Sequence, residues 1–110
     1  MDLDLAFTIS VDIVKDESEL LDYICAAIPG AERDRGYVKL MGNLLKFEEN
    51  ADYDPARVDE AEGWQYFRYE LCVFPHSVFN VETQRKLVSI LAAQLTGIGA
   101  KLAVFSDFDA

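Results

Sequence analysis

The chain has 110 residues, 51% of them hydrophobic, and no Pro-, Gly- or Ser-rich stretch long enough to act as a linker. We therefore predict a single domain over residues 1–110, with enough apolar side chains to fold without disulfides or metals. Ten basic residues stand against twenty acidic ones, a formal charge of −10. This charge argues against binding to nucleic acid, whose phosphates attract Lys and Arg. It fits either a surface kept soluble by its charge or attraction to a basic partner.

The N-terminal part predicts a strand followed by a helix. Residues 5–13 are apolar at every second position, which is the pattern of a half-buried strand. Asp16 can cap the N-terminus of a helix, and Glu19, three residues later, completes a capping box. Apolar residues at helical spacing then run over 20–28, and the Pro-Gly pair at 29–30 ends the helix.

Two short β-prone runs, Tyr37–Met41 and Leu44–Phe47, predict a hairpin in the middle of the chain. Gly42 and Asn43 separate them and can adopt the positive φ angles of a tight turn. One long bulged strand is the alternative.

An acidic segment, residues 48–62, follows with seven acidic residues and one arginine, a formal charge of −6. Its apolar residues follow neither the helical nor the strand period, so we expect an exposed loop. Residues 65–74 then give the strongest strand pattern of the chain. The face of this strand that we expect to be buried consists of Phe67, Tyr69, Leu71 and Val73. The opposite face begins with Trp64 and Tyr66 and has too many aromatic residues for an ordinary solvent-exposed face.

A second helix is expected after Asn80, a plausible N-cap residue, with its buried stripe over residues 84–95. Gly97 is expected at the C′ position of a Schellman motif, and residues 101–105 form the last strand. A helix, a turn and a strand thus account for the apolar stretch 87–105, which otherwise matches a bilayer span in length.

The elements follow the order β, α, β, β, loop, β, α, β, which resembles two strand-helix-strand units. The economical architecture for this order is an antiparallel sheet with both helices on one face. We therefore predict an α+β fold of the ferredoxin-like sandwich type.

Catalytic motifs are missing from the sequence. It has no phosphate-binding loop, no dinucleotide fingerprint and no zinc-binding helix motif. His76 is the only histidine and is expected in a turn. Ser77 is adjacent, but neighbouring side chains of an extended chain point apart, so a catalytic triad has little support. We predict that the protein is not an enzyme; a site at His76 with nearby carboxylates is the minor alternative.

Metal and cofactor binding are not expected either. The carboxylates Asp52, Asp54, Asp59 and Glu60 lack the arrangement of a calcium loop. Cys25 and Cys72 fall in periodic stretches, so we interpret them as buried thiols. The N-terminus lacks the features of a signal peptide, so we predict that the protein is located in the reducing cytoplasm.

The stretch Gly63–Leu71, followed by Pro75 and by Ser106–Asp109 at the C-terminus, resembles small acidic immunity proteins of bacterial contact-dependent growth inhibition and related polymorphic toxin systems. The resemblance implies a cytoplasmic protein that binds one cognate toxin domain, often a basic nuclease, and blocks its active site. The resemblance implies no catalytic residues. It also implies that the partner is a protein and not nucleic acid or a membrane.

The acidic segment and its flanking aromatic residues form the expected partner-binding surface, because aromatic anchors among charges are typical of interfaces. Its residues are Asp52, Tyr53, Asp54, Asp59, Glu60, Glu62, Trp64 and Tyr66. The competing interpretation is a solvated loop, with Trp64 and Tyr66 covering a sheet edge. Other candidate surfaces are the tail, at Asp107 and Asp109, and the first helix, at Asp16, Glu17 and Glu19.

The main alternative function belongs to another class. A ferredoxin-like regulatory or small-ligand-binding domain would work as a homodimer, so a homo-oligomer is compatible with the sequence. Stoichiometry separates the two functions, because such a domain pairs with its own copy, whereas an inhibitor is competent as a monomer.

Overall fold

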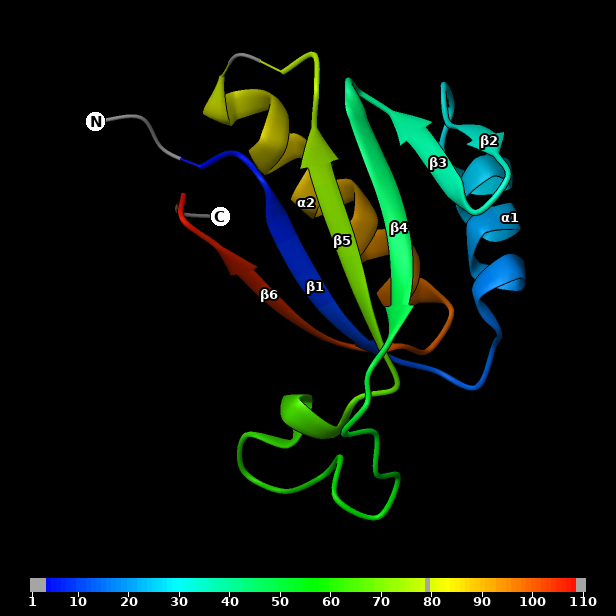
Figure 1. Ribbon diagram of the computed structural model, residues 1–110, viewed down its shortest axis with the longest axis vertical. Helices are drawn as coiled ribbons and strands as arrows, with labels where there is room; N and C mark the ends of the chain where they lie inside the picture. Colours follow the sequence, from blue (N-terminus) through cyan, green and yellow to red (C-terminus); the bar gives the residue numbers. More distant parts are fainter. Residues whose placement is uncertain (1–3, 79, 109–110) are drawn as a thin grey trace.

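Six strands, two α-helices and a short 3₁₀-helix form the described part of the chain, residues 4–78 and 80–108 of a computed structural model (Figure 1). The elements, in chain order, are β1 Phe7–Asp12, α1 Glu17–Ala27, β2 Glu32–Asp34, β3 Tyr37–Leu40, β4 Asn43–Glu49, η1 Gly63–Tyr66, β5 Tyr69–Pro75, α2 Val81–Gly97 and β6 Lys101–Ser106. The strands form one open antiparallel sheet in the order β2-β3-β4-β5-β1-β6. The predicted α+β class is confirmed.

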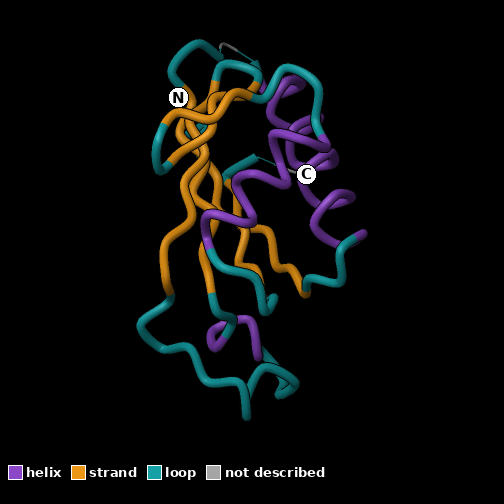
Figure 2. Tube along the Cα trace, turned by 90° about the vertical axis from the view of Figure 1, so that its right-hand side faces the viewer, coloured by secondary structure: helices purple, strands orange, loops and turns teal. Residues whose placement is uncertain are grey.

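Both helices cover the same face of the sheet, and the other face is open (Figure 2). Alternate residues of the strands are buried toward the helices, as the period of two requires. Fully buried examples are Ile9 and Val11 of β1, Leu45 of β4 and Leu71 of β5, which meet Leu20, Ile24, Leu87 and Leu91 of the helices. The core therefore lies in one layer between the sheet and the two helices.

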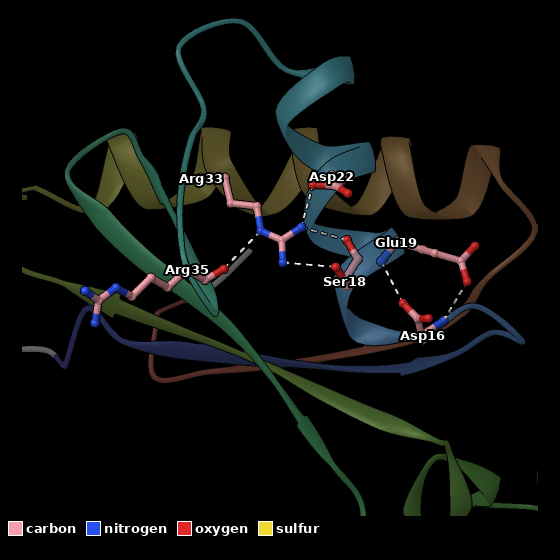
Figure 3. Close-up of polar contacts among 6 residues, drawn as sticks. All are labelled: Asp16, Ser18, Glu19, Asp22, Arg33 and Arg35. Atoms are coloured by element: carbon pink, nitrogen blue, oxygen red, sulfur yellow. Dashed lines mark hydrogen bonds and ion pairs between the residues drawn. The ribbon is translucent and has the colours of Figure 1, made fainter.

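The capping box of α1 forms as the sequence predicts (Figure 3). The Asp16 carboxylate accepts from the backbone N–H of Glu19 at 2.8 Å, and the Glu19 carboxylate accepts from the N–H of Asp16 at 3.5 Å. The capping box thus satisfies two N–H groups that have no partner within the helix. At its other end, the helix stops at Ala27, before the Pro-Gly pair.

Strand β2 was not anticipated from the sequence. It is three residues long and polar, so it carries no hydrophobic period to detect. Arg33 ties it to α1 (Figure 3): its guanidinium donates to the carbonyl and to the hydroxyl of Ser18, both at 3.1 Å, and pairs with Asp22. The turn to β3 contains Arg35 at φ 57°.

The predicted hairpin of β3 and β4 is confirmed, with its turn one residue earlier than expected. Leu40 pairs with Asn43, so the two turn residues are Met41 and Gly42, with φ of 51° and 77°. Asn43 is the first residue of β4 and is fully buried. Its amide exchanges two hydrogen bonds with Gln84 of α2, at 2.8 and 3.0 Å, which explains why it belongs to the strand.

Helix α2 begins after its Asn80 cap, as expected, but its C-terminal motif lies two residues beyond the predicted one. Gly99, at φ 92°, occupies the C′ position in place of Gly97. The N–H of Ala100 donates to the carbonyl of Leu95 at 3.1 Å and that of Gly99 to Thr96 at 3.0 Å, the two bonds of a Schellman motif. Ala100 and Leu95 are both buried and supply the apolar contact.

The predicted strand over 65–74 is wrong in its first part. Strand β5 starts at Tyr69, and Trp64 and Tyr66 belong to η1. The Asn50 amide donates to the carbonyls of Gln65 and Phe67, at 2.9 and 2.7 Å, so a side chain takes carbonyls that a strand would pair with its neighbour. From Tyr69 to Val73 the expected alternation holds, with odd residues buried.

Two further expectations concern the apolar stretch and the cysteines. No helix among the described residues combines the length and the apolar character needed to cross a bilayer. Cys25 and Cys72 are free thiols, as expected, but both are half-buried instead of fully buried. Cys25 packs against the core but is only partly buried, whereas Cys72 alternates with the buried residues of β5 and lies on the open face of the sheet.

Candidate functional site: the acidic lobe

The chain between β4 and β5, residues 50–68, forms a lobe that projects beyond one end of the sheet (Figure 1). We call it the acidic lobe. It carries five acidic residues and two arginines. Glu48 and Glu49, counted with the expected loop, belong to β4. The negative charge of residues 48–62 is therefore divided between the lobe and the sheet.

Hydrogen bonds between its two ends give the acidic lobe a defined shape. Besides the bonds of the Asn50 amide, the backbone N–H of Asn50 donates to the carbonyl of Arg68 at 2.9 Å, and that of Asp54 donates to Tyr66 at 3.2 Å. Gly63 is buried against the carbonyl of Val58, and a Cβ there would lie only 2.1 Å from that oxygen. The segment is an exposed loop, as the sequence predicts, and these contacts give it a defined path.

Two of the expected site residues are neutralised by cations of the same chain. Asp59 pairs with Lys101 of β6, and Glu60 pairs with Arg57 at 3.0 Å. Within the described residues no ion pair joins Asp52, Asp54 or Glu62 to a basic side chain. These three carboxylates carry the lobe's uncompensated charge.

Four expected residues surround one hollow of about 470 Å³ in the lobe: Asp52, Tyr53, Asp54 and Tyr66. Arg57 also lines it and lies over the Tyr66 ring, 4.1 Å from the ring centroid, a cation–π geometry. The hydrogen bonds that Arg57 donates to the Glu60 carboxylate raise the pKa of Arg57. Tyr66 therefore has an internal partner, whereas Tyr53 is 43% exposed and available.

Trp64 faces a different surface from that hollow. The centroid of its ring lies 4.6 Å from that of Phe105 of β6, on the open face of the sheet. Trp64 is 39% exposed and Phe105 is 41% exposed. Phe105 was not among the expected site residues. The signal that could have found it is the alternation of β6, since Leu102 and Val104 pack on the core and Phe105 must point to the other face.

Potential metal ligands lie close together outside the acidic lobe. Asp52, Asp54, Asp59 and Glu60 form no such group among the described residues, and Asp59 and Glu60 are paired with Lys101 and Arg57. Among the described residues, one group of three, Glu48, Glu70 and Cys72, has its ligand atoms within 4.8 Å of one another. Burial, together with the charges of Glu48 and Glu70, raises the pKa of the Cys72 thiol to about 11. A metal would have to displace that proton at neutral pH.

His76 lies on the surface after β5, as expected, but the expectation about its neighbour is wrong. The Ser77 hydroxyl and His76 Nδ1 are 2.8 Å apart. Both backbone N–H groups donate to the carbonyl of Gly42, which folds the chain back and brings the two side chains together. Both residues are exposed, and among the described residues no carboxylate hydrogen-bonds the imidazole to orient it.

The two competing surfaces also contain contacts within the chain. Asp16 and Glu19 of α1 satisfy each other's backbone in the capping box. In the tail, Phe108 packs edge-to-face on Phe7 with ring centroids 5.9 Å apart, and Asp107 lines an open hollow of about 860 Å³ beside it. Asp109 lies outside the described residues.

Comparison of the chain with protein-family models, with curated proteins and with solved structures gives no match.

Proposed function

We propose that this chain is a cytoplasmic immunity protein that binds a basic bacterial toxin domain through the acidic lobe and neutralises it. The observation that carries the proposal is that one lobe holds three carboxylates without an ion pair to the described basic side chains and also two exposed aromatic rings. The carboxylates are those of Asp52, Asp54 and Glu62, and the rings are those of Tyr53 and Trp64. Carboxylates steer a basic partner and can occupy places meant for substrate phosphates, and aromatic rings supply buried area.

The lobe's position supports this proposal. It projects from the end of the sheet, so a partner can reach it without moving a helix or strand (Figures 1 and 2). Its end-to-end hydrogen bonds lower the entropy lost when a partner binds, which favours affinity. Asp59 and Glu60, which hold Lys101 and Arg57, are assigned to the lobe's internal structure instead of to the partner.

The test uses the toxin domain encoded directly upstream of this chain's gene. Co-expression of the chain should restore growth of cells that express that domain, and the purified proteins should form a complex. Trp64→Ala should speed dissociation by roughly thirtyfold, about 2 kcal/mol, if Trp64 is a central anchor. Phe74→Ala is the matched control, since Phe74 is 49% exposed but lies at the end of β5 away from the lobe. An upstream gene of a biosynthetic operon, or no complex, would contradict the proposal.

We also propose that β4-β5-β1-β6 with α1 and α2 form a ferredoxin-like unit, to which the hairpin of β2 and β3 is added at one edge. Its support is that each helix links two strands separated by one antiparallel strand, the arrangement of two interleaved strand-helix-strand units. An experimental structure with another strand order would refute this assignment.

The alternative function, a ferredoxin-like regulatory or small-ligand-binding homodimer, has one observation in its favour. Strand β6 lies at the edge of the sheet and carries four apolar residues and a single charge. An edge of that kind can pair with another strand. A dimer that forms without any basic partner is the expected property of such a domain.

A further inference from the structure

Strand β6 is an edge without the usual protection against pairing. It is the outermost strand on its side of the sheet, and no strand among the described residues pairs with its outer side (Figure 1). Its sequence, KLAVFS, contains no proline and one charged residue. Natural edges are usually blunted by prolines, several charges, bulges or short length. The opposite edge, β2, is only three residues long and largely charged.

The same side of the molecule has a half-buried apolar flank. Leu102 and Val104 of β6 pack on the core but are only partly buried, as are Ile90 and Ile98 of α2 and the turn after it. On the open face, Phe105 is 41% exposed. Apolar surface therefore continues along β6 on both of its faces.

We propose that β6 pairs antiparallel with β6 of a second copy, centred on Ala103, to give a two-fold dimer with a continuous sheet. Opposite residues of an antiparallel pair point to the same face, so only registers that match the two faces are allowed. Centring on Ala103 places Leu102 opposite Val104 of the second copy on the helix-covered face. It places Lys101 opposite Phe105 of the second copy on the open face, where each already has a partner in its own chain, Asp59 and Trp64, so the apolar pair on the helix-covered face determines the register.

Other matched registers are less complementary. Centring on Val104 would place Leu102 opposite Ser106 of the second copy, which loses the apolar pair on the core side. The centre at Ala103 pairs all residues from Lys101 to Phe105 and sets no like charges opposite each other.

The position of the acidic lobe keeps the lobes of two copies apart in this dimer. The acidic lobe lies at one end of the longest axis of the molecule, which extends 40 Å (Figure 1). A two-fold axis through Ala103 places the two lobes at opposite ends of the dimer. Their separation exceeds the Debye length of about 8 Å at physiological salt, so their repulsion is screened. Both lobes stay open to a partner.

Sedimentation equilibrium of the full chain tests the dimer without any toxin. We expect a reversible dimer, and Ala103→Lys should raise its dissociation constant by at least about tenfold, because two ammonium groups then meet on the axis. Phe74→Lys is the matched control; it adds the same charge on the same face but away from the edge, and it should leave the constant within about twofold. Circular dichroism melting confirms that both variants fold.

Oxidative cross-linking tests the register. Ala103→Cys should give a disulfide-linked dimer, whereas Val104→Cys and the unaltered chain, with Cys25 and Cys72, should not. A chain that stays monomeric at the highest soluble concentration overturns the proposal, and so does pairing of β6 only with a toxin's strand. A dimer that cross-links through Val104→Cys overturns the register. None of these results depends on the immunity function.

Discussion

At the scale of single residues, the amides of Asn43 and Gln84 are the main polar contact inside the core. Both side chains are fully buried and exchange two hydrogen bonds, and each also bonds a backbone carbonyl: Asn43 that of Met41 at 3.0 Å, Gln84 that of Leu5 at 2.9 Å. The pair thus joins the β3–β4 turn, the start of β1 and α2. Satisfied networks of this kind fix how elements pack.

We predict that Gln84→Leu lowers the free energy of unfolding by about 1–3 kcal/mol, because the Asn43 amide and the Leu5 carbonyl lose buried partners. The measurement is urea unfolding, with Ser89→Ala on the exposed side of α2 as a control expected within about 0.5 kcal/mol. The double variant Asn43→Leu with Gln84→Leu should recover part of the loss. A single variant as stable as the control would mean that the pair does not matter.

Cys72 gives a prediction about pH. Its folded pKa, about 11, lies above its ordinary value of 9.0, so the folded protein keeps the thiol proton that the unfolded chain releases. Stability from this group is full below about pH 9 and is lost as the pH rises toward 11. In a Cys25→Ser background, the alkylation rate should rise with a midpoint near pH 11 when folded and near 9 in urea. A folded midpoint near 9 would contradict the burial assigned to Cys72.

At the scale of elements, Arg33 holds the hairpin of β2 and β3 to α1. Arg33→Ala should lower stability by about 1 kcal/mol, since the guanidinium contacts Ser18 and Asp22 are partly screened by solvent. Hydrogen exchange in β3 should accelerate more than exchange in β5. Lys39→Ala removes an exposed pair with Asp34 at 3.7 Å and is the control, expected to change little. Equal acceleration in β3 and β5 would show that Arg33 acts on the whole fold.

Elements with a hydrophobic period were predictable from the sequence, and those fixed by single hydrogen bonds were not. The alternation of β1 and the stripes of both helices depend on burial, which the sequence displays directly. The turn before Asn43 and the helix end at Gly99 depend on which residue bonds Gln84 or Leu95. Strand β2 depends on the hydrogen bonds between Arg33 and α1, and no local sequence pattern predicts that contact.

At the scale of the whole molecule, the candidate site was partly predictable. Charge and aromatic residues pointed to the segment that forms the acidic lobe, including Asp52, Tyr53 and Asp54. Composition does not distinguish one carboxylate from another, so it could not predict that Asp59 and Glu60 form ion pairs with Lys101 and Arg57. The first of these pairs joins residues 42 positions apart, a contact that only the fold creates.

The salt dependence of association with the upstream toxin domain tests the central claim most directly. The lobe variant Asp52→Asn, Asp54→Asn, Glu62→Gln removes the three lobe carboxylates that form no ion pair within the described part of the chain. The matched variant Glu19→Gln, Glu32→Gln, Asp107→Asn removes three charges from the competing surfaces and from β2. Long-range steering acts mainly on the encounter rate.

We predict that the lobe variant associates at least about tenfold more slowly at low salt, with a flatter salt dependence, and that the matched variant stays within about threefold of the unaltered chain. A lobe variant that associates and protects cells like the unaltered chain, or a matched variant that shows the larger defect, would contradict the assignment of the acidic lobe as the toxin-binding surface.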